Sequence, residues 1–149
     1  MKPFRNNGFS LIELMVAVVI VGILTAIALP SYRSYVVRGS RDAAQTELLD
    51  MASLQDKIYL NSNAYTGNVN MAYNGTATTG GLGKTSKETS DGKYSLALSN
   101  VGQTYTLTAT PVAGTTQQGD GCLTIQENGL RLWRKGDDAC TPTSPTTPW

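Results

Sequence analysis

The chain has 149 residues, with 12 lysines and arginines against 11 aspartates and glutamates, and it has no histidine. This length allows one domain plus an anchor, and the balanced charge gives no net field that would attract nucleic acid or an acidic partner. The sequence contains neither a Gly-x-Ser-x-Gly motif nor a phosphate-binding loop, so we expect no enzymatic activity, no cofactor and no metal site.

A polar, basic leader of residues 1–8 precedes an apolar run from Phe9 to Leu29, which one charge, Glu13, interrupts. About 20 residues at about 1.5 Å rise cover a hydrocarbon core of about 30 Å, so the run predicts a transmembrane helix. A carboxylate inside it costs roughly 2.5–3.5 kcal/mol, so Glu13 either has a function or is tolerated in a protonated state. Lys2 and Arg5, with no small-residue cleavage site after the run, also fit an uncleaved signal anchor.

The sequence from Gly8 to Glu13, GFSLIE, resembles the processing motif of the bacterial type IV prepilin family, and the late part of the chain resembles its class a, minor-pilin branch. This resemblance implies that a membrane prepilin peptidase cuts between Gly8 and Phe9 and methylates the new amine of Phe9. It further implies that this amine pairs with Glu13 of a staggered neighbour, which makes Glu13 an assembly residue.

The helix is expected to continue from Phe9 to about Leu60. In its second half, apolar or uncharged residues recur at three- and four-residue steps and predict one buried stripe: Ala44, Leu48, Met51, Leu54 or Gln55, and Ile58. Gly22 loosens the first half, and Pro30 removes a backbone donor, so we expect a bend there. The alternative is that a membrane helix simply tolerates both residues.

Residues 61–92 are rich in Asn, Gly, Thr and Ser and predict a long connection, which the resemblance implies is a surface lobe. Asn100–Gln103 and Asn128-Gly129 predict hairpin turns, the second because both turn residues favour positive φ. Trp133 is interpreted as a packing anchor, and the Pro/Thr-rich tail Thr141–Trp149 as an extended segment. Four alternating segments predict antiparallel strands: Lys93–Ser99, Thr104–Thr110, Cys122–Glu127 and Leu130–Lys135.

Cys122 and Cys140 are the only cysteines. Behind an export signal, two cysteines predict a periplasmic disulfide, and the alternative of a shared metal lacks further ligands. Closing a loop of this length stabilises a fold by roughly 3 kcal/mol. Asp120, Asp137 and Asp138 match no calcium-loop spacing, so we interpret Asp137 and Asp138 as part of a solvated turn.

The predicted fold class is α+β: a long N-terminal helix, transmembrane in its first half, packed on a four-stranded antiparallel sheet, as in type IV pilins. The predicted divisions are a removed leader, residues 1–8; a transmembrane and assembly helix, 9–30; an amphipathic helix half, 31–60; and a loop, sheet and disulfide-closed region, 61–149.

The resemblance implies a structural subunit, major or minor, of a type IV pilus that serves adhesion, twitching motility or DNA uptake. Its partners would be other pilin subunits, prepilin peptidase and the inner-membrane assembly machinery, and it would move from the inner membrane to the cell surface. The alternatives are a type II secretion pseudopilin and a minor pilin that binds DNA or a receptor. One contiguous face made by the following basic residues would favour DNA: Lys84, Lys87, Lys93, Arg131, Arg134 and Lys135.

Overall fold

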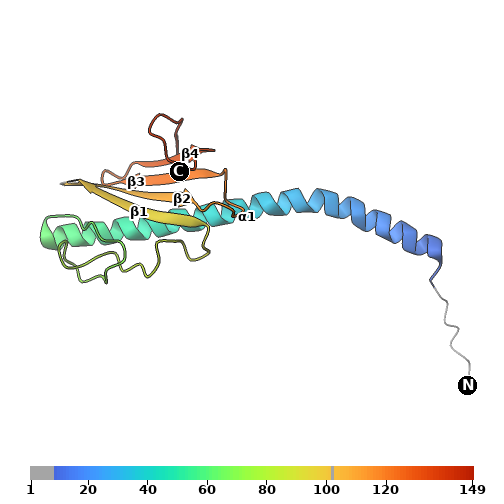
Figure 1. The fold of residues 1–149 in the computed structure, drawn as a ribbon, viewed down its shortest axis with the longest axis horizontal. Helices are drawn as coiled ribbons and strands as arrows, with labels where there is room; N and C mark the ends of the chain where they lie inside the picture. Colours follow the sequence, from blue (N-terminus) through green and yellow to red (C-terminus); the bar gives the residue numbers. More distant parts are fainter. Residues whose placement is uncertain (1–8, 102) are drawn as a thin grey trace, which may run out of the picture. The chain divides into compact units, whose positions relative to one another are not determined.

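The computed structural model describes residues 9–101 and 103–149. The predicted cleavage residue Gly8 and the turn residue Gly102 lie outside the described residues. The described chain forms one helix followed by strands, which confirms the α+β class (Figure 1). The elements are α1 (Leu11–Ser62), β1 (Tyr94–Val101), β2 (Thr104–Pro111), β3 (Gly121–Gln126), β4 (Arg131–Lys135) and β5 (Thr147–Pro148).

The chain divides into two compact units, one ending at Val36 and one comprising Val37–Trp149. The first unit contains the N-terminal part of α1, and the second, here called the head, contains the rest of α1 and all of the sheet. Within the first unit α1 remains helical through Gly22 and Pro30. The bend expected at these two residues stays a prediction.

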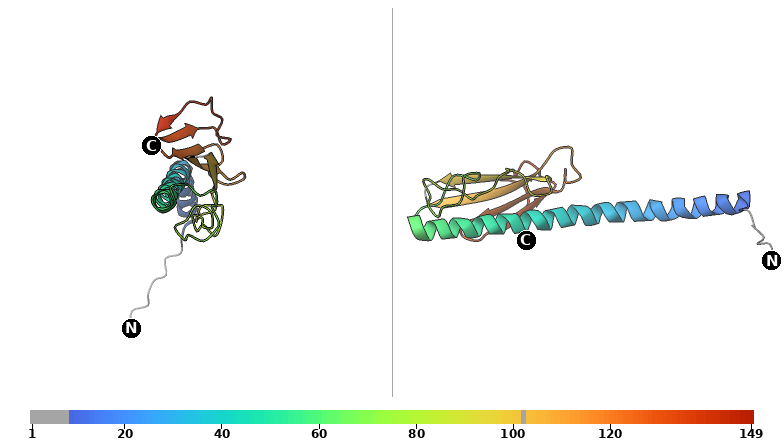
Figure 2. Two further views of the ribbon diagram at one scale, coloured as in Figure 1. Left: turned by 90° about the vertical axis from the view of Figure 1, so that its left-hand side faces the viewer. Right: turned by 90° about the horizontal axis from the view of Figure 1, so that it is seen from below.

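The predicted apolar stripe forms the contact between α1 and the sheet. Ala44, Leu48, Met51 and Ile58 are all fully buried, because a helix that packs on a sheet must bury one stripe. Gln55, rather than Leu54, fills the remaining stripe position. Figure 2 shows the sheet running along this part of α1.

Gln55 is a buried polar residue whose amide nitrogen and amide oxygen are both hydrogen-bonded. Its Nε2 donates to the carbonyl oxygen of Thr66 at 2.9 Å, and its Oε1 accepts from the backbone nitrogen of Thr66 at 3.0 Å. The Thr66 hydroxyl in turn donates to the Gly80 carbonyl at 2.8 Å. A buried amide costs little once it is paired, so Gln55 fixes the start of the long connection against α1.

The sheet is antiparallel throughout, with the strand order β1-β2-β3-β4-β5. Tyr105, Leu107 and Ala109 of β2 face the core, as the alternation predicted. Leu107 lies opposite Leu98 of β1 and Ile125 of β3, so apolar pairs continue across the sheet.

The sheet has five strands and not the four that were predicted. β5 is only two residues long and pairs Thr147 with Trp133 and Pro148 with Leu132. The Pro/Thr-rich composition of the tail predicted only an extended segment, but a proline is tolerated on an edge strand. Trp149, which follows β5, packs against the hydrophobic core.

The two predicted hairpins form, with differences in their turns. β1 continues to Val101, so part of the predicted connection belongs to a strand. At the second hairpin only Gly129 has a positive φ, 79°, and Gln126 closes the loop through its N–H to Leu130 O at 3.0 Å. The loop therefore has three residues, with glycine in the left-handed position, and the predicted two-residue turn is wrong.

Candidate assembly segment and head clusters

The N-terminal part of α1 exposes an unusually long apolar surface. Every residue from Leu11 to Leu29 is exposed, and the exposed fractions of Phe9 and Leu11 reach 76% and 78%. In the described residues α1 is the one helix long and apolar enough to cross a membrane. Apolar surface of this extent is covered by lipid or by other protein chains.

Glu13 is the single acidic residue in this apolar segment and lies in the first turn of α1. A negative charge there is favoured by the positive end of the helix dipole. Within the described residues its carboxylate accepts no hydrogen bond and joins no ion pair. Among the described residues, the Glu13 carboxylate therefore has no partner for its charge.

The most connected polar cluster of the head joins α1 to the loop before β3. Arg41 Nε donates to Asp120 Oδ2 at 2.8 Å, and Arg41 Nη2 donates to Asp120 Oδ1, so the pair is bidentate. The Arg41 guanidinium also lies 3.8 Å from the centre of the Trp133 ring, whose Nε1 donates to the Asp120 carbonyl oxygen at 3.1 Å. This geometry is typical of a strong, desolvated arginine–carboxylate contact.

Two further residues complete the cluster around the Asp120 carboxylate. Tyr94 Oη donates to it at 2.6 Å and Gln117 Nε2 at 2.8 Å, and Gln117 Nε2 also reaches the carbonyl oxygen of Val37 at 3.1 Å. Burial raises the pKa of Asp120, but the hydrogen bonds from Arg41 and Tyr94 and the charge of Arg41 outweigh it, so this pKa is lowered. Burial, followed by the bond to Asp120, raises the pKa of the Tyr94 phenol.

Sequence reasoning missed this cluster, although the sequence holds a signal for it. Arg41 precedes Ala44 and Leu48 by three and seven residues, so it continues the buried stripe at its own spacing. A charged residue on a buried stripe requires a buried partner of opposite charge. Asp120, 79 residues further along the chain, is that partner, and only the fold reveals the pairing.

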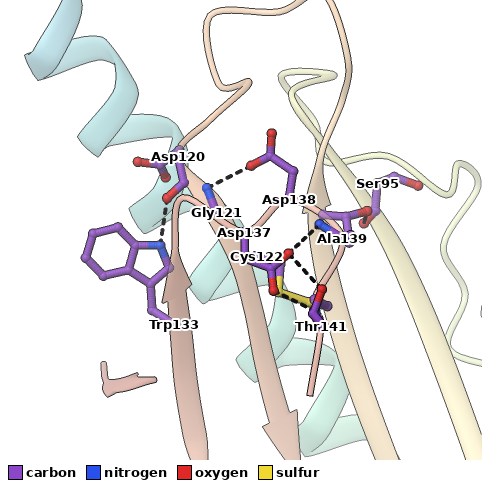
Figure 3. The surroundings of a disulfide bond; sticks show 11 residues. Ser95, Asp120, Gly121, Cys122, Trp133, Asp137, Asp138, Ala139 and Thr141 are labelled. Carbon is purple, nitrogen blue, oxygen red and sulfur yellow. Dashed lines mark hydrogen bonds between the residues drawn. A yellow bond between two sulfur atoms is a disulfide. The ribbon is translucent and has the colours of Figure 1, made fainter. Parts of the chain in front are cut away.

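The structure joins Cys122 and Cys140 by a disulfide with a Cα–Cα distance of 5.5 Å, which confirms the predicted bridge (Figure 3). The turn that it closes is ordered by aspartates. Asp138 accepts from the backbone nitrogens of Gly119 at 2.7 Å and Gly121 at 2.9 Å. Gly121 has a φ of +100°, and a Cβ there would lie 2.0 Å from the Arg134 carbonyl oxygen, so only glycine fits this approach.

Asp137 also belongs to this turn. Its carboxylate accepts from the backbone nitrogens of Ala139 at 3.0 Å and Thr141 at 2.6 Å (Figure 3). Asp137 and Asp138 therefore act as turn residues, and Asp120 belongs to the Arg41 cluster, so each aspartate has a structural use.

Removing the disulfide is expected to lower the free energy of unfolding by about 3 kcal/mol, because the unfolded chain regains loop entropy. The change is Cys122→Ser together with Cys140→Ser, measured by urea unfolding of the purified chain. Thr143→Ala, a change at an exposed position three residues after Cys140, is the control and should stay within about 0.5 kcal/mol. Free reaction of both thiols with a labelling reagent in the native, unreduced protein would refute the bridge.

The basic residues do not form one contiguous strip. Lys84 pairs with Glu47 of α1 at 2.8 Å, and Lys93 Nζ donates to Ser40 Oγ at 3.1 Å, so both hold the connection and β1 on the helix. Arg131 lies on β4, where its guanidinium is 5.7 Å from the ring centre of Trp149. Since β2 and β3 separate β1 from β4, the six residues fall into two groups.

Comparison with known proteins identifies the family of the chain. Residues 30–126 match the family model described as "Type IV minor pilin ComP, DNA uptake sequence receptor". Residues 3–29 match the prokaryotic N-terminal methylation motif. The first match ends with β3, so β4, β5 and Cys140 lie beyond it.

Three relatives are named as fimbrial or pilin proteins. The type IV major fimbrial protein FimA of Dichelobacter nodosus is 36% identical over 130 residues, covering 83% of this chain and 68% of that protein. The major pilin PilA of Myxococcus xanthus is 39% identical over 61 residues, covering 41% and 28%. A fimbrial protein of Neisseria meningitidis is 41% identical over 63 residues, covering 42% and 37%. The exposed apolar helix, the antiparallel sheet and these matches together establish that the chain belongs to the type IV pilin family.

Proposed function

We propose that prepilin peptidase cuts this precursor between Gly8 and Phe9, that the new Phe9 amine is methylated, and that the mature chain enters a pilus through its N-terminal helix. The observation that carries the proposal is the exposed apolar segment of α1 with one carboxylate, Glu13, in its first turn. The match of residues 3–29 to the N-terminal methylation motif supports the same processing.

As a type IV pilin, the precursor is anchored in the inner membrane and the assembled subunit is displayed at the cell surface. In the membrane, lipid covers the apolar face of α1, and in the filament the helices of neighbouring subunits cover it. The Phe9 amine of one subunit pairs with Glu13 of the next. This pairing turns a desolvation cost into a device that sets the register of assembly.

The proposed division of labour follows the predicted segments. Residues 9–30 anchor and assemble the subunit, residues 31–60 carry the sheet, and residues 61–149 form the surface that other molecules meet. The partners are other pilin subunits and the inner-membrane assembly machinery. We assign the chain a structural role without catalysis, in adhesion or twitching motility.

A second candidate function is DNA uptake, favoured by the family model that matches residues 30–126. The matched part contains Lys87, whose side chain is exposed. Lys84 pairs with Glu47 and Lys93 donates to Ser40, but Lys87 makes neither contact. DNA affinity that falls steeply with salt would support this function. A deletion strain that keeps its pili and its DNA uptake would argue against it.

Replacing Gly8 with leucine is expected to stop processing, because a bulky side chain at the cleavage junction prevents close approach of a protease to the backbone. Intact-mass analysis of membranes should then find the full-length chain where the wild type gives a chain that begins at Phe9.

The matched control is Asn7→Leu, which places the same side chain one residue before the junction and should leave a larger share of the chain processed. Retention of residues 1–8 in wild-type subunits, or a cut after Leu29, would disprove the proposed processing.

A further inference from the structure

The exposed face of α1 within the head carries a carboxylate, that of Asp42, which pairs with no cation among the described residues. Asp42 is exposed, and the Thr46 hydroxyl donates to its backbone carbonyl at 2.9 Å and not to its carboxylate. In the described part of the chain no cation pairs with the Asp42 carboxylate. Arg38, also exposed, lies four residues earlier on the same helix.

The proposed pairing at the N-terminus fixes an axial offset between neighbouring subunits. The Phe9 amine and Glu13 are four residues apart, which corresponds to about 6 Å along a helix. One symmetry operator relates neighbouring subunits in a filament, so their axial shift is the same at every height. This holds whatever the arrangement of the two units within each chain, because every copy has the same arrangement.

A residue of α1 therefore lies at the height of the neighbour's residue four positions later wherever the two helices adjoin. Beyond the membrane segment this offset places Arg33 against Val37, Arg41 against Gln45 and Lys57 against Asn61, none of which is acidic. The remaining basic residue of α1 is Arg38, and its counterpart is Asp42.

We propose that Arg38 of one subunit pairs with Asp42 of a neighbouring second copy of this chain, as a second register contact in the filament. This inference rests on the proposed pairing of the Phe9 amine with Glu13. In both pairs the cation comes from the earlier position and the anion from the position four residues later. A neighbour without axial shift would place Arg38 against Arg38, so the charges also disfavour the wrong register.

Cysteine pairs test the contact directly. Arg38→Cys and Asp42→Cys are expressed in the same cells on chains with different tags, and sheared filaments are oxidised and run on a non-reducing gel. The expected result is a dimer that carries both tags. The matched control combines Arg38→Cys with Asp50→Cys, whose offset of twelve residues, about 18 Å, should give no such dimer.

Charge reversal provides the second measurement. Arg38→Asp and Asp42→Arg should each lower the amount of processed chain in sheared filaments by about tenfold, because like charges then face each other. The double variant should recover the wild-type amount. This series also decides the matter if a cysteine variant fails to enter filaments.

Filaments that contain both cysteine variants without the dimer would overturn the inference, as would a double variant as depleted as the single ones. These failures are distinct from failure of the proposed function. If the proposed function fails, the wild-type chain, with its amine at Phe9, is itself missing from the filaments.

Discussion

Replacing Glu13 with valine is expected to remove the subunit from filaments while leaving it in the membrane. The change eases insertion into lipid by about 2.5–3.5 kcal/mol, because an apolar side chain replaces a carboxylate. It also leaves the Phe9 amine of the neighbouring subunit unpaired in an apolar core. Breaking one side of such a buried pair costs about 3–5 kcal/mol, which corresponds to a loss of incorporation of about a hundredfold or more.

The measurement compares processed chain in membranes with processed chain in sheared filaments. Thr25→Val is the matched control, since it makes the same segment more apolar but removes only an internal bond from Thr25 Oγ1 to the Val21 carbonyl oxygen at 2.8 Å. The control should enter filaments at the wild-type level. Stable, processed Glu13→Val that does the same would refute the pairing.

Replacing Asp120 with alanine is expected to destabilise the head by about 3–5 kcal/mol, because Arg41 would be left unpaired in a site where its side chain is 17% exposed. Tyr94 and Gln117 would lose the same acceptor. Urea unfolding of the purified chain measures the change. Asp50→Ala, an exposed change on α1, should stay within about 0.5 kcal/mol.

A double replacement separates the pair from the surrounding packing. Arg41→Met with Asp120→Leu should cost less than Asp120→Ala alone, because no buried charge remains. If the loss of stability in the double variant equals the sum of the losses for Arg41→Met and Asp120→Leu measured separately, Arg41 and Asp120 stabilise the head independently.

The same carboxylate gives the head a defined pH dependence. Since the pKa of Asp120 is lowered from its ordinary value of 3.8, its contribution is complete above that value and is lost as the pH falls through the folded pKa. Asp120→Asn removes this titration. The stability of the variant should therefore fall less than that of the wild type in this acid range.

The sequence predicted the features of the chain that depend on local pattern. The observed α1 begins two residues after the predicted start at Phe9 and ends two residues after Leu60. The stripe from Ala44 to Ile58 is buried because its spacing matches the helical period. Four strands, the disulfide and the family resemblance likewise followed from alternation, cysteine count and a short motif.

The features that the sequence did not predict depend on contacts far apart in the chain. β5 has two residues, too few for an alternating pattern, and it forms because β4 offers an edge and Trp149 finds a place against the core. The position of Arg41 on the buried stripe requires an acidic partner, but nothing in the sequence singles out Asp120, and their pairing exists only once the sheet packs on α1.

The most direct test of the account is mass spectrometry of filaments sheared from the surface of cells that express the wild-type chain. We expect this chain in the filament fraction, with a mass that corresponds to residues 9–149 plus one methyl group at Phe9 and with Cys122 and Cys140 joined. Absence of the chain from filaments that otherwise assemble normally would contradict it, as would its presence with residues 1–8 still attached.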